Sequence, residues 1–347
     1  MTQIAPRLVS RLVPQLDSQM AAFVENSMSH YPADAVGASI DQQRRWYRAM
    51  YESLAAPRPP NLVIKNSVVE GPDGHSIPVR YYQPKHLSAH GQINSNVQVV
   101  YFHGGGFVVG DLDSHDDVCA EITNFCGFNL VSVDYRLAPE NQYPCDINDC
   151  LAVVDELLNQ GKKIILVGDS AGATLAACVA NARASYTGTQ LLAQVLIYPA
   201  LAHERFTRSM DEHANAPLLT KADMAFYHAI RVGGNDVNTS SPTSMPIPIP
   251  IPIPIPKQDQ LYCPMQAQTF DGLPPSYLFP AQIDPLHDDC ALYARALDDA
   301  GVKVENHTQI GLGLVHGYLR ARHTSDKAAA NFKKICETVL SLGRAEV

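Results

Sequence analysis

The chain has 347 residues, a length at which an α/β fold can still form one unit with a large buried core. Its 35 acidic residues outnumber the 26 basic ones, and the net charge of −9 argues against nucleic acid or an anionic membrane surface as the main partner. An apolar fraction of 46% with 18% charged residues is typical of a globular protein and excludes a disordered one.

Export and membrane signals are not evident in the sequence. Residues 1–31 contain arginines and short apolar patches, but not the continuous apolar run of a secretory signal. No apolar stretch reaches the roughly 18 residues that span a bilayer. The eight cysteines include no Cys-x-x-Cys pair, which favours buried reduced thiols over zinc ligands or disulfides. We therefore predict a cytoplasmic protein.

The first part of the chain is predicted to be helical and then to form a hairpin. Apolar residues recur at three- and four-residue steps from Leu8 to Val24, which indicates an amphipathic helix, and the helical pattern continues to about residue 55. Prolines at positions 57, 59 and 60 end this region. The segments 62–69 and 77–82 flank a Gly-Pro-Asp-Gly turn and are expected to pair as strands.

Short apolar segments then alternate with helical ones. Strands are expected at 97–102, 129–135, 163–167 and 193–198, with helices at 116–126 and 146–159 between them. The pattern resumes after an interruption, with strands at 275–283 and 302–310 and helices at 288–300 and 325–342. Apolar strands of this kind are covered on both faces, and their alternation with helices predicts a mostly parallel sheet with right-handed crossovers.

The interruption covers residues 201–268. A helix is expected at 210–233, and an isoleucine–proline repeat follows at 246–256. Six alternate prolines exclude a helix and a central strand, so the repeat should be an extended, polyproline-II-like tether. We interpret it as an expansion tolerated in a surface loop, the alternative being a docking ligand for an aromatic groove.

The stretch Ile164–Gly172 predicts a nucleophile. An apolar strand breaks at Gly168, presents Ser170, and passes through Gly172 into an alanine-rich helix. A Gly-x-Ser-x-Gly sequence by itself also fits an ordinary tight turn. The strand before it and the helix after it favour the sharp turn that exposes a catalytic serine.

Two further residues complete a candidate catalytic triad. Asp284 and His316 each follow a predicted strand, and they come after Ser170 in the order serine, acid, histidine. Functional groups of open α/β sheets collect beyond the carboxyl ends of the strands. Ser170 would be the nucleophile, His316 the general base and later the acid, and Asp284 the carboxylate that orients it.

Rival residues for these roles lie close by in the sequence. Asp288 is an alternative acid, but its position predicts the first turn of a helix. His287 and His323 are alternative bases, and neither lies between a last strand and a glycine as His316 does.

The sequence His103-Gly104-Gly105-Gly106 predicts an oxyanion hole. The amides of Gly104 and Gly105, with the amide of Ala171 at the start of the helix, could stabilise the negative charge formed on an attacked carbonyl. A flexible glycine turn is the alternative. A phosphate-binding loop is a further one, but the Gly-x-x-x-x-Gly-Lys pattern is missing. We predict no metal site.

Taken together, these motifs resemble the hormone-sensitive lipase family of α/β-hydrolases, which includes bacterial esterases. The matching stretches are 103–106, 110–116, 133–140, 168–172, 284–288 and 316–318. The resemblance implies an α/β-hydrolase fold, with a mostly parallel eight-stranded sheet flanked by helices. It also implies a helical cap formed by residues 1–50 and 201–268, over a catalytic domain formed by residues 51–200 and 269–347. The Ile–Pro repeat departs from the family pattern within this cap.

The activity implied by the resemblance is that of a cofactor-free serine carboxylesterase, acting on short- to medium-chain acyl esters through an acyl-enzyme. A homodimer is possible for such a protein. An amidase or deacetylase would use the same triad, and a true lipase is a third enzymatic alternative. A non-catalytic small-ligand receptor is also known on this scaffold, but the gibberellin receptors lack the histidine that is present here as His316.

Overall fold

The computed structural model describes residues 16–32, 38–85, 96–202, 207–233 and 259–345. Its strands are β1 (Leu62–Glu70), β2 (Ser76–Pro84), β3 (Val97–Phe102), β4 (Asn129–Val133), β5 (Lys163–Asp169), β6 (Leu191–Ile197), β7 (Ser276–Phe279) and β8 (Val304–Asn306). They form one sheet in the order β1-β2-β4-β3-β5-β6-β7-β8. The pairs β1–β2 and β2–β4 are antiparallel, and all other neighbours are parallel. The predicted mostly parallel, eight-stranded sheet is therefore confirmed, as is the hairpin at its start.

The described helices follow the predicted alternation closely. They are α2 (Ser18–Ser29), α3 (Ile40–Leu54), α4 (Asp116–Cys126), α5 (Cys145–Asn159), α6 (Ala171–Ala182), α7 (Arg208–Glu212), α8 (Lys221–Arg231), α9 (His287–Asp299) and α10 (Asp326–Arg344). The predictions for α4, α5, α9 and α10 are correct to within two residues at each end. Of the predicted N-terminal helical region, α2 and α3 lie in the described residues and 1–15 lie outside them.

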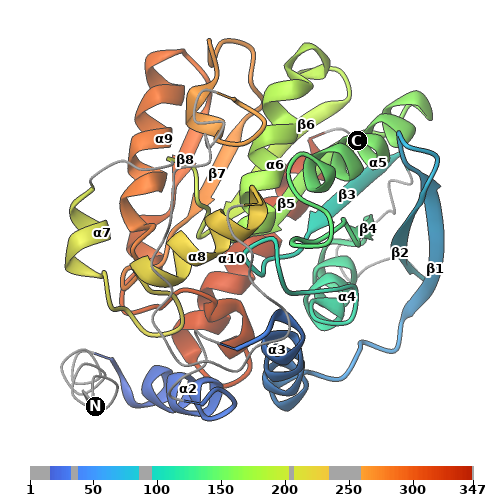
Figure 1. The fold of residues 1–347 in the computed structure, drawn as a ribbon. Helices are drawn as coiled ribbons and strands as arrows, with labels where there is room; N and C mark the ends of the chain where they lie inside the picture. The colour runs from blue at the N-terminus through green and yellow to red at the C-terminus, as the bar shows by residue number, and fades with distance from the viewer. Residues whose placement is uncertain (1–15, 33–37, 86–95, 203–206, 234–258, 346–347) are drawn as a thin grey trace.

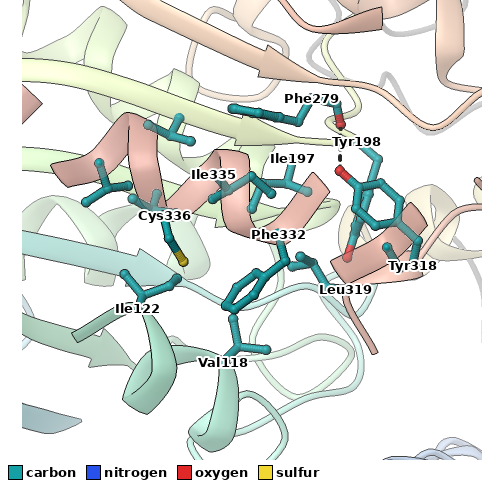
Figure 2. Packing of buried hydrophobic residues seen from close by; sticks show 14 of the residues in the cluster. Val118, Ile122, Ile197, Tyr198, Phe279, Tyr318, Leu319, Phe332, Ile335 and Cys336 are labelled. Atoms are coloured by element: carbon teal, nitrogen blue, oxygen red, sulfur yellow. Dashed lines mark hydrogen bonds between the residues drawn. The ribbon is translucent and has the colours of Figure 1, made fainter. Parts of the chain in front are cut away.

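Apolar side chains cover both faces of the sheet. In β3, Val99 and Tyr101 face the layer that contains α4 and α10, whereas Val100 and Phe102 face the layer that contains α5, α6 and α9. Successive residues of a strand point to opposite faces, so a strand with partners on both sides must be apolar throughout. Figure 2 shows α10 packed beside α4 in the first of these layers.

The strand predicted at 302–310 is much shorter than expected. Only Val304–Asn306 pair as β8, because the chain turns into a 3-10 helix at Thr308–Gly311. A Cβ on Gly311 would lie 2.2 Å from the carbonyl oxygen of Pro280. The chain beyond β8 therefore runs close against the backbone at Pro280.

The helix predicted at 210–233 is broken into α7 and α8. Leu218, between them, has a positive φ of 69°, which does not continue a helix. Thr220 and Asp223 then form a reciprocal capping box that starts α8. The Ile–Pro repeat at 246–256 lies outside the described residues, so its conformation stays a prediction.

Four helices, α2, α3, α7 and α8, do not alternate with the strands. Figure 1 shows α2 and α3 at the bottom of the view, with α7 and α8 above them at about mid-height. Ile40 of α3 and Ile230 of α8 share one apolar cluster with Val108, Val109 and Ala138. These two helices therefore pack on the loops that follow β3 and β4.

The cysteines and the helix lengths bear on two other predictions. All eight cysteines are free thiols and all but Cys145 are buried, as predicted. Within the described ranges, no helix combines the length and the apolar character needed to cross a lipid bilayer.

Candidate active site

The turn between β5 and α6 exposes Ser170. Its backbone has φ of 54° and ψ of −122°, a conformation that costs a non-glycine residue on the order of 1–3 kcal/mol. Glycines on either side allow the tight approach, since a Cβ on Gly168 would lie 2.4 Å from the Gly172 oxygen. A Cβ on Gly172 would lie 2.0 Å from the Phe102 oxygen. The predicted strand, sharp turn and helix are all present.

The three predicted triad residues lie in one hydrogen-bonded chain. Ser170 Oγ is 2.8 Å from His316 Nε2, and His316 Nδ1 is 2.7 Å from Asp284 Oδ2. A parallel bridge between Ile283 and Val315 places Asp284 and His316 side by side. Asp284 is fully buried, and its second oxygen accepts the Leu286 N–H at 2.9 Å.

The rival residues bond to other parts of the chain. Asp288 accepts the backbone N–H of Ser209 at 2.9 Å. His287 Nδ1 lies 2.8 Å from the Ala281 carbonyl oxygen, and His323 Nε2 lies 2.8 Å from Glu121. None of these contacts involves Ser170.

Two tyrosine rings support the imidazole of His316. The ring of Tyr198 lies 4.7 Å from the His316 ring, and Tyr318 meets Tyr198 edge to face at 5.0 Å. Figure 2 shows the hydroxyl of Tyr318 directed at the carbonyl oxygen of Phe279, at 3.4 Å. The same hydroxyl donates to Asn331 at 2.8 Å, so the pair of rings is fixed from behind.

The prediction for Gly104 is wrong, because its amide is already occupied. Gly104 N–H donates to Asp169 Oδ1 at 2.9 Å. By contrast, none of the hydrogen bonds formed among the described residues uses the amide of Gly105, Gly106 or Ala171. Of the three amides that the sequence predicts as donors, the structure therefore leaves those of Gly105 and Ala171 without a hydrogen bond to any described residue, and it adds the amide of Gly106.

The glycine loop itself is a tight turn. The amides of Val108 and Val109 both donate to the Gly105 oxygen, at 3.1 and 3.0 Å. Gly105 has φ of 133°, and a Cβ there would lie 2.0 Å from the Val109 oxygen. A side chain at this position would displace the turn.

Helix α8 covers the glycine loop. A Cβ on Gly106 would lie 2.5 Å from the ring of Tyr227, so this ring lies directly against the loop. Burial is the main cause that raises the pKa of Tyr227, and the negative charge of Asp223 raises it further, so the phenol stays neutral. An apolar aromatic surface therefore borders the loop.

The residue directly before the serine is a buried carboxylate that the sequence did not single out. Asp169 is buried and its carboxylate contacts the glycine loop, a hydroxyl of β3 and a histidine. The available signal was an acidic residue at the end of an otherwise apolar, buried strand. Among the described residues, no group of three or more His, Cys, Asp or Glu side chains is arranged to hold a metal ion.

Comparison with known proteins agrees with this geometry. Residues 99–320, more than half of the chain, match a family described by the alpha/beta hydrolase fold. The chain belongs to the hormone-sensitive lipase family of α/β-hydrolases. The resemblance inferred from the sequence motifs is thus confirmed.

Individual members of the family are similar over most of the chain. Esterase LipI of Mycobacterium tuberculosis is 35% identical over 270 residues, which cover 76% of this chain and 77% of LipI. Carboxylesterase NlhH of the same organism is 35% identical over 285 residues, which cover 78% of this chain and 81% of NlhH. The solved structure of an esterase from Pyrobaculum calidifontis superposes with a TM-score of 0.73 at 27% identity, over 88% of this chain and 94% of that esterase.

Proposed function

We propose that this carboxylic ester hydrolase is a serine carboxylesterase that hydrolyses short- to medium-chain acyl esters through an acyl-enzyme, with Ser170, His316 and Asp284 as its triad. The observation that carries the proposal is the hydrogen-bonded chain from Ser170 Oγ through His316 to Asp284. A serine hydroxyl is a weak nucleophile until a base takes its proton, and this chain supplies the base.

In the first step, Ser170 Oγ attacks the ester carbonyl while His316 Nε2 takes the hydroxyl proton. Asp284, bonded to Nδ1, fixes the tautomer that leaves Nε2 free to accept, and it stabilises the imidazolium that forms. The buried position of Asp284 keeps water from competing for this hydrogen bond.

The attack places a negative charge on the carbonyl oxygen. We assign its stabilisation to the amides of Gly105, Gly106 and Ala171, since these donors are not used by other hydrogen bonds among the described residues. Ala171 opens α6, so the positive end of that helix dipole also faces the charge. Donors fixed in this way before the reaction need no reorganisation as the charge develops.

The intermediate then collapses and expels the alcohol. His316 returns its proton to the leaving oxygen, and the acyl group remains bonded to Ser170 Oγ. A water molecule enters, His316 takes a proton from it, and the same steps in reverse order release the carboxylic acid and restore the serine. No cofactor takes part in these steps.

We also propose that residues 1–50 and 201–268 form the cap and that the rest of the chain forms the catalytic domain. The contact between Tyr227 of α8 and Gly106 supports a cap that reaches the site. The apolar cluster shared by α3 and α8 supports a cap assembled from both segments. Because the Tyr227 ring limits the room beside the glycine loop, we expect small acyl groups to be preferred.

Hydrolysis of nitrophenyl esters from acetate to laurate tests the proposal. In the Ser170→Ala variant we expect kcat to fall by about 10⁶-fold, the size of loss when a triad serine is removed. Ser67→Ala, an exposed serine on β1, is the matched control and should retain full activity. Substantial turnover by folded Ser170→Ala protein contradicts the proposal, and faster cleavage of matched anilides than of esters would make the protein an amidase.

A further inference from the structure

The carboxylate of Asp169 lies beneath the glycine loop. Oδ1 accepts the Tyr101 hydroxyl at 2.8 Å and the Gly104 amide at 2.9 Å. The second oxygen lies against the loop as well, since a Cβ on Gly104 would be 2.5 Å from Oδ2. The loop therefore rests directly on this carboxylate, and only glycine at position 104 permits the contact.

The same carboxylate also contacts Tyr198, the residue whose ring packs on His316. The Tyr198 hydroxyl lies 3.3 Å from Asp169 Oδ2, and the Tyr198 ring packs on His316 at 4.7 Å. His115 Nε2 also lies 3.3 Å from the carboxylate. Asp169 precedes Ser170 directly, so one side chain touches the surroundings of the nucleophile, the base and the glycine loop.

The surroundings of Asp169 favour a charged acceptor. Burial alone would raise the pKa of Asp169, but the charge and hydrogen bond of His115, the Tyr101 hydroxyl and the charge of Arg320 hold the pKa below its ordinary value. The Tyr101 and Tyr198 hydroxyls and the Gly104 amide all approach as donors. A carboxylate has acceptor sites on both oxygens, whereas an amide would present an N–H to one of these donors.

We propose that Asp169 is a positioning residue that fixes the height of the glycine loop above Ser170, so that the amides of Gly105 and Gly106 meet the developing oxyanion. The proposal rests on the function proposed above. Asp169 does not touch the substrate, and it acts through the Gly104 amide. Loss of its acceptor oxygen would let the loop shift, and a misplacement of about 1 Å costs on the order of 100-fold in rate.

The Asp169→Ala variant tests the proposal, because Asn would keep one oxygen as an acceptor for the Gly104 amide. We expect kcat for nitrophenyl butyrate to fall by about 100-fold with KM within a factor of about two, since the loop acts on the transition state rather than on substrate binding. Active-site titration with a nitrophenyl phosphonate corrects for any inactive fraction. The matched control is Asp149→Ala, because Asp149 is also fully buried and also accepts a backbone amide, that of Arg136 at 3.0 Å.

A transition-state mimic distinguishes a positioning role of Asp169 from a merely structural one. A trifluoromethyl ketone forms a tetrahedral adduct with an oxyanion, so its inhibition constant should rise in Asp169→Ala in parallel with the loss of kcat/KM. In Asp149→Ala both quantities should stay at the wild-type level even if the melting temperature falls. Equal losses in the two variants, or an unchanged inhibition constant in Asp169→Ala, would overturn the proposal.

Tyr101→Phe provides a second test if Asp169→Ala does not fold. It removes one of the two donors on Oδ1 and leaves the carboxylate in place. We expect a several-fold fall in kcat with unchanged KM, and a wild-type kcat counts against the proposal. The Ser170→Ala variant distinguishes a failure of this proposal from a failure of the proposed function. Retained activity in Ser170→Ala refutes the triad, whereas wild-type kcat in Asp169→Ala refutes only the positioning role.

Discussion

Asp289 allows a sharp prediction about the dependence of stability on pH. It lies in the first turn of α9 and is fully buried, with Oδ2 accepting the amides of Leu201 and Ala202 at 2.8 and 2.9 Å. Oδ1 has no hydrogen-bond partner among the described residues. Burial, with the nearby carboxylates of Asp284 and Asp288, raises the pKa of Asp289 from 3.8 to about 7, against the effect of the two amides.

The raised pKa of Asp289 determines how stability changes with pH. Because the pKa is higher in the folded protein than in the unfolded chain, Asp289 contributes its full stability below about pH 4 and loses it as the pH rises toward 7. The complete loss corresponds to on the order of 4 kcal/mol. Asn at this position cannot ionise and keeps one oxygen for the two amides.

We therefore expect Asp289→Asn to gain stability over the wild type as the pH rises. Between about pH 5 and pH 8 the difference in free energy of unfolding should grow by about 2–3 kcal/mol. Urea unfolding at each pH, followed by the fluorescence of Trp46, the single tryptophan of the chain, measures it. Asp298→Asn removes an exposed charge from the same helix and should give a constant difference. A constant difference for Asp289→Asn as well would refute the reasoning.

Two further predictions concern the triad acid and the attachment of α8. Asp284→Asn should lower kcat by about 10⁴-fold in the nitrophenyl ester assay, because the imidazole loses its correct tautomer, while Asp288→Asn should keep near wild-type kcat; the opposite result would make Asp288 the acid. Arg231→Met should cost about 3–5 kcal/mol, because it leaves Asp146, bonded to Arg231 at 2.7 Å, charged and buried without its partner. The double variant with Asp146→Leu should recover most of the melting temperature, and a failure to recover would mean that Arg231 acts through its contact with Phe107.

The sheet, and the meeting of Ser170, Asp284 and His316 at one site, were predictable because each rests on a local signal. Strands such as β3 and β5 are continuous apolar runs, which only a sheet covered on both faces accommodates. Ser170, Asp284 and His316 each follow an apolar segment, and in a parallel sheet those ends meet at one edge. Chain order alone was then enough to propose their roles.

What the sequence did not predict depends on contacts between distant segments. Whether the Gly104 amide is free is decided by Asp169, which lies 65 residues away in the chain. After β8 the chain turns and brings Gly311 against Pro280, 31 residues away in the chain, and neither residue signals this contact by type. The break between α7 and α8 did have a local signal, since Thr220 and Asp223 have capping-box spacing, but the helical pattern on both sides masked it.

The separation of the triad along the chain has a consequence for biosynthesis. Ser170 and His316 lie 146 residues apart, and the bridge that brings His316 beside Asp284 joins Ile283 and Val315, which follow β7 and β8 in the chain. Under the proposed mechanism, a nascent or prematurely terminated polypeptide that ends before position 316 carries the hydroxyl without the base that activates it. We therefore expect ester hydrolysis to begin only when the C-terminal part has been synthesised and folded.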